Sequence, residues 1–165
     1  MTIDTLKRAL KFLLFCLLQA LVLNRIQLFN VATPLLYIYF VMTFPLGFPK
    51  WAGLLWGFAM GLVIDIFSNT PGLASSSLTL IACIQPYLLQ LFLSQETDNG
   101  AKPSVRTMGL GKFFTFAITI VFLFCFILFT IEAFNFFNWQ HWLGSIVGST
   151  LLTLLFIMAF EMWEK

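Results

Sequence analysis

The stretch that decides the fold reads GLVIDIFSNTPGL, from Gly61 to Leu73. It places one carboxylate, Asp65, inside an apolar segment and follows it at once with a short polar turn. A charged side chain near the centre of a membrane costs about 2.5 to 3.5 kcal/mol on insertion scales, so this Asp has to be paired or hydrogen-bonded. The stretch therefore predicts two apolar segments joined by a turn, with Asp65 as the best pointer to a structural or functional site.

The composition indicates an integral membrane protein. The 165 residues are 60% hydrophobic and 10% charged, which is more apolar surface than a small soluble core can bury. The apolar residues form long continuous runs without alternation, which favours helices over the strands of a barrel. We therefore expect an all-α protein, a compact six-helix transmembrane bundle that forms a single domain over residues 1–165. The expected spans are 10–23, 31–46, 51–67, 73–93, 113–137 and 142–162, and residues 94–111 are expected to form a flexible cytoplasmic loop.

The placement of basic residues predicts the orientation. Lys and Arg collect in the cytoplasmic loops of membrane proteins. With six spans and a cytoplasmic N-terminus, Arg25 alone of the nine Lys and Arg residues faces outward. The sequence therefore predicts a multi-pass protein with both termini in the cytoplasm.

The sequence carries no motif of an enzyme. It contains no phosphate-binding loop, no nucleophile elbow and no metal-binding His pair on a helix. The cysteines are widely spaced and are expected to be buried small hydrophobes, and His141, the lone histidine, is expected at the membrane interface. The net charge of +2 is explained by topology, so no nucleic-acid partner is expected. We expect a non-enzymatic protein without catalytic residues, cofactor or metal.

Small residues recur at every fourth position of the run 51–67, so they share one helix face, where another backbone can approach closely. Gly144 and Gly148 form a second small-residue face in the last run. Each face can pack within the bundle or against a separate transmembrane partner, and both alternatives stay open here. The positions of the first stripe are Gly53, Gly57, Gly61 and Asp65.

Three roles are considered for Asp65. It follows Lys50 by 15 residues, or roughly 22 Å along a helix, which places it in the outer leaflet just before the turn. The next run begins after Gly72, and the first N–H groups of a helix lack partners within that helix. We expect Asp65 to accept hydrogen bonds from these groups and to pin the turn. The alternatives are a salt bridge to Arg25 and a role in transport or proton relay.

The turn and its flanks resemble the signature of the rod shape-determining protein MreD family. The chain length, the six apolar runs, the short basic N-terminus and the proline that opens the second run, Pro34, are similar as well. The residues that carry the resemblance are Gly61, Leu62, Asp65, Ser68, Pro71, Gly72 and Leu73.

This resemblance implies a non-enzymatic scaffold of the bacterial cell-elongation machinery, located in the bacterial cytoplasmic (inner) membrane, with MreC and membrane lipid as partners. It implies a connection, direct or indirect, between MreB filaments inside and RodA with its transpeptidase partner, which build peptidoglycan outside. It also implies a fold similar to the substrate-binding subunits of energy-coupling-factor transporters.

That similarity supplies the alternative function, a substrate-binding membrane subunit of a vitamin-type transporter. Such a subunit needs a cavity near the outer face with converging polar groups. Co-purification of a ligand would separate it from the scaffold. The polar candidates near the expected outer face are Asn24, Arg25, Glu132, Asn135, Asn138 and His141.

Overall fold

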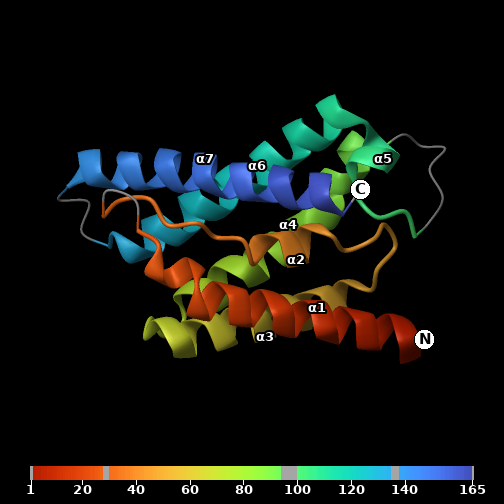
Figure 1. Cartoon of the computed structure of the whole chain (residues 1–165), viewed down its shortest axis with the longest axis horizontal. Helices are drawn as coiled ribbons and strands as arrows, with labels where there is room; N and C mark the ends of the chain where they lie inside the picture. Colours follow the sequence, from red (N-terminus) through yellow and green to blue (C-terminus); the bar gives the residue numbers. More distant parts are fainter. Residues whose placement is uncertain (1, 28–29, 94–99, 135–137, 165) are drawn as a thin grey trace.

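The computed structural model describes residues 2–27, 30–93, 100–134 and 138–164, and this part of the chain is all-helical. Its long helices lie along the long axis of the molecule, as Figure 1 shows. The elements in chain order are α1 (Thr2–Leu21), the 3-10 helix η1 (Leu23–Arg25), α2 (Ile38–Met42), α3 (Lys50–Ser68), α4 (Leu73–Phe92), α5 (Val105–Met108), α6 (Leu110–Glu132) and α7 (Trp139–Trp163).

Four of the described helices, α3, α4, α6 and α7, are long and apolar enough to cross a membrane. They coincide closely with four of the expected spans, so the chain is a helical membrane protein, as its composition predicted. Residues 135–137 of the expected fifth span lie outside the described residues.

The first expected span is part of a longer helix. Helix α1 has 20 residues and begins eight positions before residue 10, because Asp4, Lys7, Arg8 and Lys11 belong to it as well. Its second half is apolar apart from Gln19. The charged first half therefore lies at one end of the bundle, where charged side chains reach the membrane surface.

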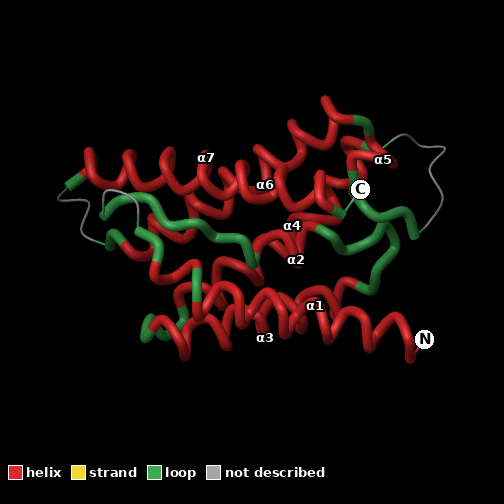
Figure 2. Tube along the Cα trace, viewed as in Figure 1, coloured by secondary structure: helices red, strands yellow, loops and turns green. Residues whose placement is uncertain are grey.

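The prediction of one helix over residues 31–46 is wrong. This segment is a non-helical stretch followed by the five-residue helix α2 and a further loop, and Figure 2 shows it running between α1 and α7. Pro34 contributes to this, because it lacks an N–H and disfavours a helical conformation at Thr33. The bundle of six transmembrane helices is therefore not confirmed.

Polar side chains of neighbouring helices replace the missing helical hydrogen bonds of this segment. The N–H of Thr33 donates to Ser149 Oγ at 3.2 Å, and the N–H of Leu35 donates to Thr153 Oγ1 at 3.0 Å. Non-helical backbone is tolerated at membrane depth only where protein or water satisfies it. The two α7 hydroxyls meet this requirement, and the stretch from Leu36 to Met42 lies in the core, with no side chain more than 4% exposed.

The described part of the expected cytoplasmic loop contacts the segment after α2. Residues 94–99 lie outside the described residues, but Gly100 N–H donates to Leu46 O at 2.8 Å, and Leu46 N–H donates to Ala101 O at 3.0 Å. The short helix α5 follows, and α6 begins at Leu110. Residues 100–109 thus contain hydrogen bonds to the segment after α2 and one short helix, while the flexibility expected of this loop stays a prediction.

Both termini lie at the same end of the molecule in Figure 1, and we call it the terminal end. The far end carries η1, the turn between α3 and α4, the last turn of α6 and the first turn of α7. An even number of passes, as expected from the basic residues, is compatible with this arrangement.

Candidate functional site

The Asp65 carboxylate joins α3 to α4 at the far end. Its Oδ1 accepts a hydrogen bond from Ala74 N–H at 2.8 Å, and its Oδ2 accepts one from Ser75 N–H at 3.0 Å. The Thr70 hydroxyl lies 3.3 Å from Oδ1, and the Asp65 residue is only 5% exposed. Both amides belong to the first turn of α4, where N–H groups lack helical acceptors. The hydrogen bonds predicted for Asp65 are confirmed.

The alternative salt bridge is wrong. Arg25 lies in η1 and is exposed, and within the described ranges it makes no ion pair with Asp65. The ion pair that the described residues do contain joins Lys11 Nζ to Glu164 Oε1 at 3.0 Å, at the terminal end. A transport or relay role for Asp65 stays a prediction.

The glycine stripe of α3 packs inside the chain. A Cβ added to Gly61 would overlap Ser75 Cα and lie 2.6 Å from Ser75 N, so backbone meets backbone there. A Cβ on Gly57 would lie 3.1 Å from Ala82 Cβ, whereas one on Gly53 would be in ordinary contact with the Phe44 ring at 3.7 Å. The stripe therefore lies against α4 at Gly61 and Gly57, and that face is already filled.

The remaining signature residues shape the turn. Asn69 ends α3 with a left-handed φ of 56°, and Gly72, with φ 85°, precedes α4 in a conformation that favours glycine. Ser68 Oγ accepts a hydrogen bond from Asn24 Nδ2 at 2.8 Å. Pro71 is exposed within the turn. These residues, with Asp65 and Gly61, build the α3–α4 hairpin.

The second small-residue face also packs inside the chain. A Cβ on Gly148 would lie 2.9 Å from Ala32 Cβ, and one on Gly144 would lie 3.5 Å from Val31 Cγ1. Helix α7 thus lies against the non-helical segment that precedes α2. Pro34 of the same segment is buried, and its carbonyl accepts a hydrogen bond from Gln19 Nε2 at 2.9 Å.

Sequence reasoning missed Gln19, the centre of a buried polar network. Its Nε2 also donates to Asn24 Oδ1 at 2.9 Å, while its Oε1 accepts from Leu36 N–H at 3.1 Å. The Gln19 residue is fully buried. Since Asn24 donates in turn to Ser68, the network ties α1 and η1 to α3 and to the non-helical segment. A carboxamide within an apolar run was the available signal.

Gln85 has a similar role nearer the terminal end. It is 3% exposed, and its Nε2 donates to the carbonyls of Phe44 at 3.1 Å and Met42 at 3.4 Å, where α2 ends. Together with the α7 hydroxyls of Ser149 and Thr153, it satisfies backbone that does not continue as a helix.

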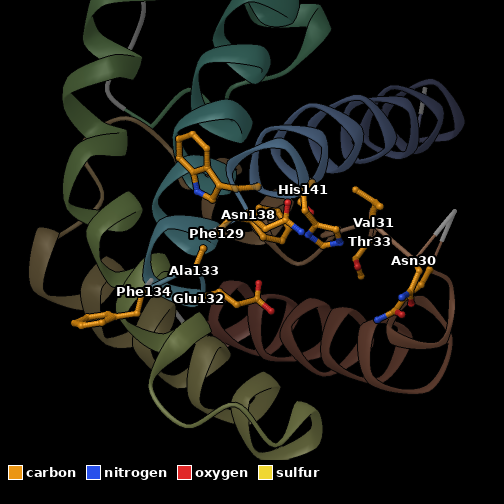
Figure 3. Close-up of a pocket in the computed structure, with 12 residues that line it drawn as sticks. Asn30, Val31, Thr33, Phe129, Glu132, Ala133, Phe134, Asn138 and His141 are labelled. Carbon is orange, nitrogen blue, oxygen red and sulfur yellow. The ribbon is translucent and has the colours of Figure 1, made fainter. Parts of the chain in front are cut away.

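A polar cavity opens at the far end beside this network. It consists of two adjoining pockets of about 600 and 470 Å³, which share Gln27, Thr33, Phe129 and Glu132 in their walls. Figure 3 shows the smaller pocket, with Glu132, Asn138 and His141 among its labelled residues. Asn24 and Arg25 line the larger one.

Five of the six polar residues expected near the outer face therefore line this cavity, and the sixth, Asn135, lies outside the described residues. The walls offer a guanidinium, a carboxylate, an imidazole and carboxamides, which suit the recognition of a polar ligand by hydrogen bonds and charge. No group of three His, Cys, Asp or Glu side chains placed to hold a metal occurs among the described residues.

Comparisons of this chain with known protein families, with curated proteins and with solved structures found no match.

Proposed function

We propose that this protein is a non-enzymatic scaffold of the bacterial cell-elongation machinery, which binds MreC and helps to couple MreB filaments to peptidoglycan synthesis by RodA and its transpeptidase partner. The observation that carries the proposal is the use of the signature residues. Both oxygens of Asp65 hold the start of α4, and Gly61 allows its backbone to touch α3. A motif whose residues hold two helices together suits a scaffold better than a catalyst.

Because the glycine face of α3 is already filled by α4, a partner such as MreC would have to bind elsewhere. The glycine stripe lies against α4, so a partner helix would contact surfaces that face outward instead. On α3 these surfaces carry exposed apolar side chains at helical spacing, on the side away from the stripe. They are Trp51, Leu55, Phe58, Leu62 and Ile66.

The proposed location is the bacterial cytoplasmic membrane with both termini in the cytoplasm. The described basic residues gather at the terminal end, and Arg25 is the exception at the far end. Single cysteines at positions 2 and 164, introduced into a variant without native cysteines, should both react with a cytoplasmic probe. Labelling from opposite sides would refute the orientation.

Co-purification with MreC and rescue of rod shape test the scaffold. The tagged protein should recover MreC from membranes of a rod-shaped bacterium depleted of its own MreD, and should restore rod shape there. Asp65→Leu should lose both, while Leu151→Ala, at an exposed position of α7 outside the proposed α3 contact surface, serves as the control. If the wild-type protein accumulates and folds but recovers no MreC and no shape, the proposal fails.

The far-end cavity favours a second candidate, a substrate-binding subunit of a vitamin-type transporter. Its carrying observation is the convergence of Arg25, Glu132, Asn138 and His141 on one cavity. Mass spectrometry of the gently purified protein should then reveal a small polar ligand, which Glu132→Gln should weaken and Lys112→Gln, at the other end, should not. A cavity that holds only lipid or water after such purification would count against this candidate.

A further inference from the structure

A second charged cavity lies at the terminal end, away from the hairpin and the polar network. It has a volume of about 450 Å³ and lies between the first turns of α1, the end of α2 and the segment that holds Gly100 and Lys102. We call it the terminal groove. Four basic side chains, Lys7, Arg8, Lys11 and Lys102, line it.

The basic side chains of the groove outnumber its acidic ones. The lining contains two carboxylates, Asp4 and Glu164, against four cations, so an excess of two positive charges remains. Lys11 Nζ is bonded to Glu164 Oε1 at 3.0 Å. Among the described residues, the ammonium groups of Lys7 and Lys102 make no ion pair. Lys7 and Lys102 are therefore available to bind an anion.

The position of Arg8 is fixed by an aromatic ring. Its guanidinium carbon lies 4.2 Å from the centroid of the Phe48 ring, within the range of a cation–π contact. Phe40, Phe44 and Pro45 form an apolar part of the lining behind the charges. The groove thus combines cations with an apolar wall, as expected of a site for an amphiphilic anion.

An apolar ridge of α1 begins beside the cations. Leu10 and Leu14 follow Lys7 by three and seven residues, so they lie on the Lys7 side of the helix, and they are 64% and 49% exposed. Leu17 and Leu21 continue this ridge towards the far end. Such a ridge suits an acyl chain whose headgroup lies at the level of Lys7 and Arg8, because lipid chains lie along the helix and headgroups lie at its end.

From these features we infer that the terminal groove binds the phosphate headgroup of an anionic phospholipid, with an acyl chain along the Leu10 to Leu21 ridge of α1 next to Lys7. Lys7 and Lys102 bind the phosphate from opposite walls, and Arg8 adds hydrogen-bond donors. Inorganic phosphate would use the cations but not the ridge. An acidic peptide would use the cations but gain nothing from lipid-facing leucines.

Native mass spectrometry of the full chain, released from nanodiscs, tests this inference. The nanodiscs contain phosphatidylglycerol in phosphatidylcholine, and the bound lipid is counted and titrated. The Lys7→Gln/Lys102→Gln variant should bind phosphatidylglycerol roughly 30-fold more weakly, since each basic side chain near a lipid surface contributes substantially to binding. The control Lys50→Gln/Lys112→Gln removes the same charge from the same end, outside the groove, and should bind as the wild type does.

Separate arms use inorganic phosphate and a polyglutamate peptide as competitors. Retention of phosphatidylglycerol by the wild type and the control, with loss in the groove variant, supports the site. Equal retention of phosphatidylcholine, or equal losses in both variants, would overturn it. Displacement of the lipid by inorganic phosphate or polyglutamate at equal concentration would overturn the assignment to a lipid. A Leu10→Gln variant, which keeps all cations, should weaken lipid binding without affecting phosphate.

Discussion

Two buried carboxylates, Asp65 at the far end and Glu161 at the terminal end, hold helix starts in the same way but over very different distances in the sequence. Asp65 accepts from amides nine and ten residues further on. Glu161 accepts from Val105 N–H, the first residue of α5, at 3.1 Å, and from the Tyr39 hydroxyl at 2.6 Å, across 56 and 122 residues. The comparison shows that a buried carboxylate can join two consecutive helices through nearby amides, or join segments that lie far apart in the sequence.

The donors at the two sites differ in kind. Both main donors to Asp65 are backbone amides, which can only donate. One donor to Glu161 is a hydroxyl, which can also accept a hydrogen bond. We therefore expect the contacts of Asp65 to depend more on a carboxylate than those of Glu161 do. The four predictions that follow test this difference.

Gly61→Ala should have the largest effect, because it forces apart the two helices that Asp65 joins. The new Cβ would overlap Ser75 Cα, which is backbone and cannot rotate away. We expect a loss of about 3 kcal/mol in the free energy of unfolding in mixed micelles. Gly53→Ala, whose Cβ would lie 3.7 Å from the Phe44 ring, should be neutral or slightly stabilising. Equal losses for the two variants would contradict the close approach at Gly61.

Asp65→Leu leaves two amides of α4 without acceptors and should cost about 2 to 3 kcal/mol in the same measurement. Asp65→Asn keeps one acceptor oxygen and should cost about half as much. Membrane abundance and restoration of rod shape are scored together with stability. If Asn and Leu were equally inactive while both proteins accumulated normally, the hairpin role would not explain the defect, and a relay role would gain.

Gln19→Leu removes the side chain that bonds the backbone of the non-helical segment. It frees Pro34 O and Leu36 N–H within the non-helical segment, so we expect a loss of about 2 kcal/mol. The matched control is Gln90→Leu, at an exposed position of α4. Hydrogen exchange at Leu36 should speed up in the first variant only. Unchanged exchange there would mean that other groups satisfy the segment.

Glu161→Gln should have the smallest effect, less than about 1 kcal/mol. The new amide oxygen can still accept from Val105 N–H, while the Tyr39 hydroxyl reverses and accepts from the amide nitrogen. Glu161→Leu removes both contacts and should cost more. A loss for Glu161→Gln that equals or exceeds that of Asp65→Asn would contradict the proposed difference between the two sites.

Residues 31–46 show why the fold was only partly predictable. This segment is apolar enough to suggest a span, and Pro34 was identified only as the residue that opens it. The hydrogen bonds that make a non-helical backbone acceptable come from Gln19, Ser149 and Thr153, up to 118 residues away. Nothing in the local pattern shows that these partners converge on one segment.

The sequence by itself determined the membrane class, the four long apolar helices and the hydrogen bonds of Asp65. These depend on composition, on helical periodicity and on partners within ten residues, all of which are local quantities. Only the tertiary structure decided that the glycine faces pack inside the chain, and that polar groups far apart in sequence meet at Gln19, at Glu161 and around the far-end cavity. Such contacts depend on how whole helices pack, and the residues of any single helix do not show which distant residues it will meet.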